Sequence, residues 1–160
     1  MKIRTGKPQD LPFLEQMLFE AFFWHPDQER PVVQEFMQRP EFKKLLMNWG
    51  RNGDRAIIAE EKEIPVGAAW YRLWTEKDHS YGFVDADTPE LGIGVLASHR
   101  SKDMGRALLR ALIRGAREDE FRTLSLSVDP GNFALQLYES EGFVKVGESG
   151  TSWTMLLRLR

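Results

Sequence analysis

Cysteine is missing from the 160-residue sequence, and its absence removes several classes of chemistry at once. Disulfides, thiolate metal sites and a cysteine nucleophile are all excluded. A chain without cysteine fits a reducing compartment, so we expect a cytoplasmic location. The three histidines, His25, His79 and His99, are scattered without the spacing of metal ligands, so no metal site is expected.

An excess of charge of one sign and long apolar runs are missing as well. The 22 basic and 24 acidic residues leave a net charge of −2, which gives no electrostatic reason to expect nucleic-acid or membrane binding. No run approaches the roughly 18 consecutive apolar residues of a membrane span. Residues 1–5 lack the apolar core of a signal peptide, so we expect none.

The residues that are present describe one folded domain, which we expect to cover residues 1–160. Hydrophobic residues make up 42% of the chain and charged residues 29%, as is ordinary for a globular protein. Alternation and turn residues predict strands at 2–5, 55–60, 65–75, 89–97, 123–128, 143–146 and 152–159. Helical spacing predicts helices at 11–22, 104–115 and 133–139, and a helical region between residues 31 and 50.

The order of these elements predicts the fold class. The strand–helix–strand unit over residues 90–128 should form a right-handed parallel crossover. The hairpins on either side of it should be antiparallel. We therefore expect an α/β fold with a mixed, mostly antiparallel central sheet, one parallel strand pair and helices on both faces.

The segment from residue 90 to residue 109 is the most informative part of the chain. It reads as a strand, a loop and the start of a helix, and the loop holds Arg100, Lys102, Gly105 and Arg106. Such a loop can present backbone N–H groups, cations and the positive end of a helix dipole to one anion, and a pyrophosphate fits that environment. The alternative is a solvated basic turn.

A second segment, residues 125–143, reads as a strand, a turn and a short helix. Together the two segments resemble the acetyl-CoA-binding motifs of the GNAT N-acetyltransferase family, and the match covers roughly residues 90–147. Arg100 and Gly105 fall where the family's pyrophosphate loop has its Arg or Gln and its last glycine. The family's Asn…Ala…Leu-Tyr-Glu…Gly-Phe element is matched by Asn132, Ala134, Leu137, Tyr138, Glu139, Gly142 and Phe143.

The resemblance implies a fold of the acyl-CoA N-acyltransferase type, with acetyl-CoA as co-substrate and no metal. In that fold the strand after Glu90 separates from its parallel neighbour, and the pantetheine arm pairs with the exposed strand edge. A backbone N–H near Val95 or Leu96 would stabilise the oxyanion. The residues expected to bind the coenzyme are Val95, Leu96, Arg100, Ser101, Lys102, Asp103, Met104, Gly105, Arg106 and Asn132.

The resemblance also implies two catalytic residues. Tyr138 resembles the family's usual general acid, which hydrogen-bonds the departing sulfur. Glu90 resembles an acidic position that serves many members as general base, often through water. The alternative for Tyr138 is a packed tyrosine on an amphipathic helix, and for Glu90 a solvated carboxylate at a strand end. Without cysteine no thioester can form on the protein, so we expect direct attack in a ternary complex.

The acceptor is expected to be a primary amine, and the sequence leaves open a small amine, an amino acid, an antibiotic or a protein N-terminus. Aromatic side chains beside carboxylates suit an amine. The pocket candidates are Trp24, Trp70, Arg72 and Trp74, with Asp85, Asp87 and Glu90 available to attract a cation. The alternative is that the tryptophans only cover the sheet. A homodimer is compatible with the resemblance, because dimers are common in that family.

One position departs from the family pattern, because Asp103 stands where the first loop glycine is usual. A carboxylate about 6 Å from a phosphate would cost roughly 2–3 kcal/mol of binding free energy. Asp103 is alternatively expected to turn inward and cap the helix, with Arg100, Lys102 and Arg106 offsetting its charge. The departure keeps a second function open, a non-catalytic acyl-CoA-sensing or protein-interaction module on the same fold.

Overall fold

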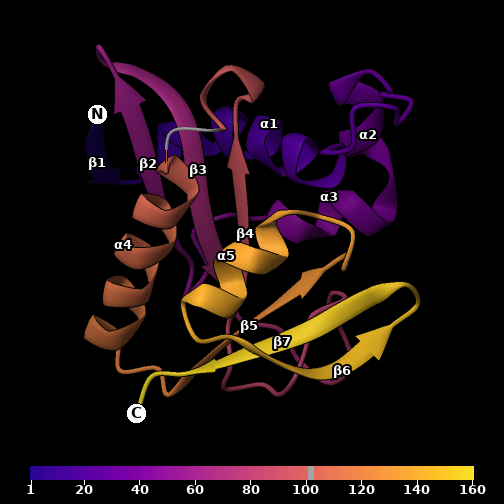
Figure 1. Cartoon of the computed structure of the whole chain (residues 1–160), viewed down its shortest axis with the longest axis vertical. Helices are drawn as coiled ribbons and strands as arrows, with labels where there is room; N and C mark the ends of the chain where they lie inside the picture. The colour runs from indigo at the N-terminus through magenta and orange to yellow at the C-terminus, as the bar shows by residue number, and fades with distance from the viewer. Residues whose placement is uncertain (101–102) are drawn as a thin grey trace.

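The computed structural model in Figure 1 describes residues 1–100 and 103–160, and it contains a seven-stranded sheet with helices on both faces. The elements are β1 (Lys2–Thr5), η1 (Pro8–Asp10), α1 (Leu11–Phe22), α2 (Val33–Gln38), α3 (Pro40–Leu46), β2 (Arg55–Glu61), β3 (Ile64–Arg72), β4 (Glu90–Val95), η2 (Ala97–His99), α4 (Met104–Glu118), β5 (Thr123–Val128), α5 (Ala134–Ser140), β6 (Val144–Ser149) and β7 (Ser152–Arg158).

The sheet consists of two antiparallel halves joined by one parallel contact, in the order β1-β2-β3-β4-β5-β7-β6. β1 to β4 form the first half, and β5, β7 and β6 form the second. Between the halves, β4 and β5 run parallel and share a single register pair, Glu90 and Ser125. The expected mixed sheet with one parallel pair is therefore confirmed.

α4 forms the crossover between the parallel strands and packs on one face of the sheet (Figure 1). Its inner stripe includes Leu108, Leu109 and Leu112, all fully buried, while its outer side carries arginines. Burying one leucine side chain contributes roughly 1.5–3 kcal/mol, so this stripe holds the crossover against the sheet. Tyr138 of α5 and the following Phe143 belong to the same core.

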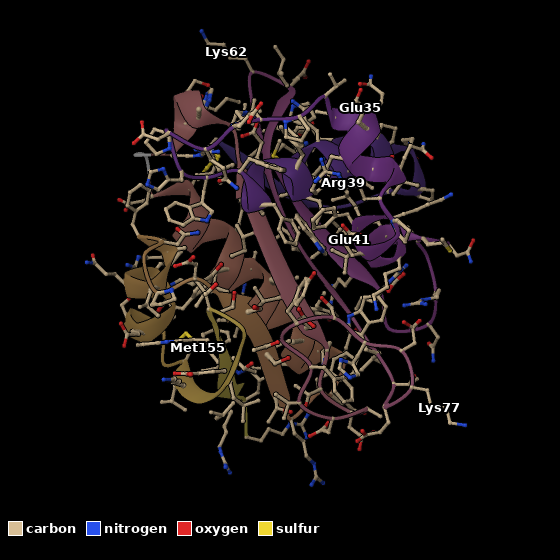
Figure 2. All side chains as sticks on the ribbon, turned by 90° about the vertical axis from the view of Figure 1, so that its right-hand side faces the viewer. Glu35, Arg39, Glu41, Lys62, Lys77 and Met155 are labelled. Carbon is tan, nitrogen blue, oxygen red and sulfur yellow. The ribbon has the colours of Figure 1, made fainter. Side chains whose placement is uncertain are left out.

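The opposite face of the sheet is covered by α1, α2 and α3. Met17 of α1 and Phe36 of α2 are fully buried in this second core. Glu35, Arg39 and Glu41 are exposed on the outside of α2 and α3, where Figure 2 labels them. The apolar residues of these short helices thus face the sheet, and their charged residues face the solvent.

The predicted elements are present, and several of their ends differ by a few residues. β3 ends at Arg72 instead of residue 75, because Thr75 begins a tight turn in which its N–H bonds to the carbonyl of Asp78. α5 begins one residue later than predicted, at Ala134, whose N–H donates to Asn132 Oδ1 over 3.0 Å. Gly142 has φ +102°, so the left-handed residue predicted after α5 is confirmed.

Candidate active site

Beyond the pair formed by Glu90 and Ser125, β4 and β5 diverge and leave a gap in the sheet. Leu96 donates its N–H to the carbonyl of Val66 over 2.9 Å. Because polar groups alternate in direction along an antiparallel strand, Val95 turns its N–H and C=O away from β3 and toward the gap. A role for the Val95 N–H stays a prediction. The prediction for Leu96 is wrong, because its N–H is bonded within the sheet.

A cleft of about 1320 Å³ opens at the gap and continues between the sheet and α1 and α3. Its walls come from α1 and the loop after it, β3, β4, the start of α4, and α5, so segments far apart in the sequence meet there. Most of the predicted site residues line it: Trp24, Trp70, Arg72, Trp74, Glu90, Val95, Arg100, Asp103, Gly105, Arg106, Asn132 and Tyr138.

Three other residues predicted to bind the coenzyme are Met104, Ser101 and Lys102. Met104 is 1% exposed and packs in the core under α4, so its side chain does not reach the cleft. Its backbone N–H lies in the first turn of α4, and a role for it in binding the coenzyme stays a prediction. Ser101 and Lys102 lie outside the described residues.

Two glycines of β4 let neighbouring groups approach the floor of the cleft. A Cβ on Gly94 would lie 2.2 Å from the carbonyl oxygen of Met17 in α1, and a Cβ on Gly92 would lie 2.7 Å from Cζ2 of Trp70. Both distances are shorter than van der Waals contact. Only glycine therefore allows α1 and the indole to pack directly on this strand.

Arg100, predicted to bind the pyrophosphate, is held by partners within the protein. Its Nε donates to the carbonyl of Val95 over 3.0 Å, and its Nη2 lies 2.9 Å from Glu20 Oε2 in α1. Glu20 also pairs with Arg30 over 2.8 Å. These bonds hold the chain just after β4 in place. The carboxylate of Glu20 also offsets the positive charge of Arg100 that a phosphate would otherwise meet.

Asp103 does not cap α4 as predicted, because its side chain makes no capping hydrogen bond. Its backbone has φ +56° and ψ +17°, the left-handed conformation, whereas a capping residue normally has extended backbone angles. Glycine adopts the left-handed region without the steric cost, roughly 1–2 kcal/mol, that a Cβ brings. The backbone conformation at residue 103 is thus one that suits the glycine usual at this position.

Gly105 and Arg106 join the start of α4 to α5. A Cβ on Gly105 would lie 3.3 Å from Cδ2 of Leu137, so the residue permits close packing of the two helices. Arg106 donates to Ser140 Oγ over 2.9 Å and lies 3.5 Å from Glu141 Oε1. Arg106 and Arg100 both have partners elsewhere, so the expected offset of the Asp103 charge by these arginines is not seen.

Tyr138 projects from α5 into the wall of the cleft and is 7% exposed. Its ring meets Phe143 edge-on, with 5.8 Å between the centroids. Burial raises the pKa of Tyr138 to about 12, so the phenol stays protonated at neutral pH. A buried phenol of this kind can donate a hydrogen bond to a sulfur atom that gains negative charge.

Glu90 lies at the start of β4, where the two halves of the sheet meet. Its Oε2 accepts the N–H of Gly82 over 3.2 Å, while Oε1 is buried without a hydrogen-bond partner in the described parts of the chain. Burial raises the pKa of Glu90 from 4.5 to about 7, and the bond from Gly82 opposes that rise. A carboxyl group that is half ionised near neutral pH is well suited to accept a proton.

Gly82 belongs to the long connection between β3 and β4, which folds back over the sheet. A Cβ on Gly82 would lie 2.6 Å from the carbonyl carbon of Leu126 in β5, so the glycine is in close contact with that strand. Lys77 of the same connection projects into solvent (Figure 2). Asp85, a candidate for attracting a cation, instead accepts the N–H of Asp87 and the hydroxyl of Thr88, both over 2.9 Å.

Trp70 and Trp74 line the part of the cleft between the sheet and the helices α1 and α3, where the acceptor is expected, and each is 5% exposed. Trp74 also lies within cation–π distance of three basic side chains, those of Lys44, Arg51 and Arg72. Both tryptophans are therefore part of the core that covers the sheet as well as part of the wall. Their role with an acceptor stays a prediction.

Arg72 lines the same side but is 2% exposed and has structural partners. Its Nε and Nη2 bond to the two carboxylate oxygens of Asp54 over 3.0 and 2.7 Å, and Nη1 donates to the carbonyl of Met47 over 2.7 Å. The charge of Arg72 is thus neutralised within the fold, and a role for this residue with an acceptor stays a prediction.

Trp24 lies at the mouth of the cleft, in the loop after α1. A Cβ on Gly131 would be 3.9 Å from its ring, and its ring centroid is 6.4 Å from that of Phe133. The loop after α1 and the start of α5 thus approach each other across the opening.

Several residues of the site were missed from the sequence. Glu20 and Gly82 lie in segments without a recognisable motif, and nothing in their spacing points to Arg100 or Glu90. Ser125 had a signal, since it interrupts the apolar residues of β5. It is fully buried, and its hydroxyl has no hydrogen-bond partner within residues 1–100 and 103–160.

A family model described as the acetyltransferase (GNAT) family matches residues 12–143. The chain belongs to the GNAT acetyltransferase family. Among curated proteins no sequence matches the chain.

Solved structures with the same fold cover nearly the whole chain. The ribosomal-protein-alanine N-acetyltransferase from Brucella melitensis has 24% identity and a TM-score of 0.72, with 99% of each chain covered. The yncA structure from Salmonella typhimurium, which contains its cofactor acetyl-CoA, has 21% identity and a TM-score of 0.70, covering 100% of this chain and 94% of that one. The paia N-acetyltransferase from Thermoplasma acidophilum, solved with coenzyme A, has 17% identity and a TM-score of 0.73, with 99% of each covered.

These GNAT relatives establish the fold, and two of them contain the coenzyme in their structures. In the part of this chain that is described, no helix is long and apolar enough to cross a membrane. The same residues contain no cluster of three His, Cys, Asp or Glu side chains that could hold a metal ion. A cytoplasmic location and a homodimer stay predictions.

Proposed function

We propose that the protein transfers the acetyl group of acetyl-CoA directly to a primary amine in a ternary complex. One observation carries the proposal: β4 and β5 separate beyond a single register pair, with Glu90 at the point of separation and Tyr138 in the wall of the same cleft. The free edge of β4 presents the N–H of Val95, while the carbonyl of Val95 accepts a hydrogen bond from Arg100, and an exposed N–H at a strand edge suits a carbonyl group of the acyl-pantetheine arm.

In the proposed reaction the acceptor nitrogen forms a bond to the thioester carbonyl carbon, and the carbon–sulfur bond breaks. Glu90 accepts the proton that the nitrogen loses. The Val95 N–H stabilises the charge that develops on the carbonyl oxygen. Tyr138 donates a hydrogen bond to the sulfur, and because its pKa of about 12 exceeds that of a thiol, about 8.5, it stabilises the thiolate without fully losing its proton.

Two measurements test the proposal. Calorimetry with acetyl-CoA measures binding, and the release of free thiol in the presence of primary amines measures turnover. We expect binding and amine-dependent thiol release. The absence of both would overturn the proposal and leave only the fold.

The second candidate is a non-catalytic acyl-CoA sensor, and two observations favour it. Asp103 brings a carboxylate to the loop expected to hold the pyrophosphate, and Arg100 is already paired with Glu20. Binding of acetyl-CoA without thiol release for any amine would favour the sensor over the enzyme.

A further inference from the structure

The acceptor side of the cleft is apolar apart from a few groups. Between the sheet and the helices α1 and α3, its wall is built from Leu18, Phe22, Phe42, Leu45, Trp70 and Trp74. A ligand group that enters there exchanges water for aromatic and aliphatic surface, which favours an apolar or aromatic substituent.

The described cations of the cleft are compensated by groups within the protein. Arg72 is neutralised by Asp54 at 2.7 Å, and Arg100 by Glu20 at 2.9 Å. Arg106 bonds to α5, away from the acceptor side. None of these guanidinium groups offers an unpaired charge to a substrate carboxylate.

His25 completes the set of basic side chains among the described residues that line the cleft. The backbone N–H of Asp27 donates to its Nδ1 over 3.1 Å, so this ring nitrogen is occupied within the protein and does not donate to a substrate carboxylate.

Glu90, by contrast, has an oxygen that lacks a partner. Oε1 is buried and without a hydrogen-bond partner among the described residues, and the side chain lines the cleft. A buried acceptor of this kind attracts an N–H donor, as an amine or ammonium group provides. It would repel a second carboxylate that arrived with the amine.

We propose, as an extension of the acetyltransferase function above, that the acceptor is a primary amine on an apolar or aromatic group without a carboxylate beside it. Amino acids are then poor acceptors. Amines without the acid group, and amines whose acid is masked as an amide, are good ones.

The test compares acceptors that differ only in this group: 2-phenylethylamine, phenylalanine amide and phenylalanine, each with acetyl-CoA. A short peptide that starts with phenylalanine and has no charged side chains is a fourth acceptor. Its amine, like that of 2-phenylethylamine, has no carboxylate beside it, so comparing the two shows whether the protein prefers a small amine or a peptide N-terminus. We expect kcat/KM for phenylalanine to be lower than for phenylethylamine and the amide by about tenfold or more.

A ratio below about threefold, or a preference for phenylalanine, would overturn the acceptor class while leaving the acetyltransferase function intact. No acetylation of any amine by protein that binds acetyl-CoA would instead overturn the acetyltransferase function, and the acceptor class with it. The two failures are therefore distinguishable.

Ser125 carries an independent observation. Its hydroxyl and Glu90 Oε1 are both buried without hydrogen-bond partners in the described structure. The two residues are register partners at the contact between β4 and β5, and the N–H of Ser125 bonds to the carbonyl of Pro89 over 3.0 Å. Side chains of register partners lie on the same face of a sheet, about 5 Å apart.

The geometry assigns Ser125 a positioning role for Glu90. Buried hydroxyls are nearly always hydrogen-bonded, and an ionised carboxylate can only accept. No direct bond joins the two groups, so the Ser125 hydroxyl donates toward Oε1 through one water and favours the ionised form of Glu90. The second lone pair of Oε1 stays available for the N–H of an amine. Other polar groups that act on this carboxyl come from Gly82 and Ser80, and the charged groups near it are His79, Lys44 and Arg72, its register partner in β3.

The pH dependence of kcat/KM in Ser125→Ala and Ser125→Thr tests this role. We expect the acidic limb of Ser125→Ala to move up by about half to one pH unit, with unchanged acetyl-CoA affinity, and Ser125→Thr to keep the wild-type limb because it retains a hydroxyl. An unchanged limb in Ser125→Ala, with a melting temperature like that of the wild type, would overturn the assignment.

Discussion

Burial beside the cleft shifts the pKa values of Tyr138 and Glu90 in the same direction but with different consequences. Burial disfavours the charged form of each side chain, so the pKa of Tyr138 rises to about 12 and that of Glu90 to about 7. The tyrosine is thereby kept as a hydrogen-bond donor. The carboxyl is brought to the pH range in which it can exchange protons, which is the division of roles that acid–base catalysis requires.

Replacing Tyr138 by phenylalanine removes one hydroxyl and keeps the ring that packs on Phe143. We expect kcat to fall by about 10- to 1000-fold, because the sulfur loses its hydrogen-bond donor. Acetyl-CoA affinity should change little. Steady-state kinetics together with calorimetry check both points, and a rate equal to that of the wild type would remove Tyr138 from the mechanism.

Glu90→Gln should change both the pH profile and the pH dependence of stability. In the wild type, kcat/KM should rise with pH through about 7 as the carboxyl ionises, and the variant should lose this limb and most of its activity. The folded-state pKa lies above the usual 4.5, so the stability contribution of the carboxyl is present below pH 4.5 and lost as pH rises through 7.

Glutamine stays neutral, so the variant should be more stable than the wild type at pH 8, on the order of 1–3 kcal/mol, and equal to it near pH 4. Thermal unfolding at the two pH values measures the difference. If the two proteins were equally stable at pH 8, ionising Glu90 would cost the folded protein nothing, and its pKa would not be raised by burial.

At the scale of elements, the start of α4 depends on the left-handed residue that precedes it. Asp103→Asn removes the charge and keeps a side chain that tolerates this conformation, whereas Asp103→Gly removes the charge and the strain together. We expect both to bind acetyl-CoA more tightly, up to about a hundredfold, and only the glycine variant to gain stability as well. Weaker binding in both variants would show that the aspartate itself holds the loop.

The contact between α1 and β4 depends on Gly94. In Gly94→Ala the new Cβ would fall 2.2 Å from the carbonyl oxygen of Met17, so the helix must move. We expect a loss of at least about 2 kcal/mol in unfolding free energy, measured by urea denaturation. Gly147→Ala in β6 is the matched control, since its Cβ would meet no atom within 4 Å, and it should change stability by less than about 0.5 kcal/mol.

At the scale of the whole molecule, the two halves of the sheet share little backbone bonding, because β4 and β5 have one register pair. A coenzyme that pairs with the free edge of β4 would contact both halves. At 100 times its dissociation constant it should stabilise the fold by about 2.7 kcal/mol, which raises the melting temperature by roughly 5–10 °C. Differential scanning calorimetry with and without acetyl-CoA measures this shift, and no shift at millimolar coenzyme would contradict the proposed site.

The sequence predicted the elements and their order well, because periods of two and 3.6 residues are local properties. It also predicted which residues share the cleft, since Asn132, Tyr138 and the loop before α4 belong to contiguous motifs. It failed where a side chain has a distant partner. Arg72 looked available beside Trp70, and nothing in the spacing indicates that Asp54, in the turn before β2, neutralises its charge.

Side chains alternate between the two faces of β4, so its odd-numbered and even-numbered residues have different roles in the site. The odd residues, Leu91 to Val95, turn their side chains to the core under α4 and their backbone polar groups to the gap. The even residues, Glu90 to Gly94, supply the carboxylate and the clearance for α1. Inserting or deleting one residue at the start of β4 would exchange the two sets of residues. The strand would then lose the carboxylate of the proposed base, its exposed polar edge and the clearance for α1 at the same time.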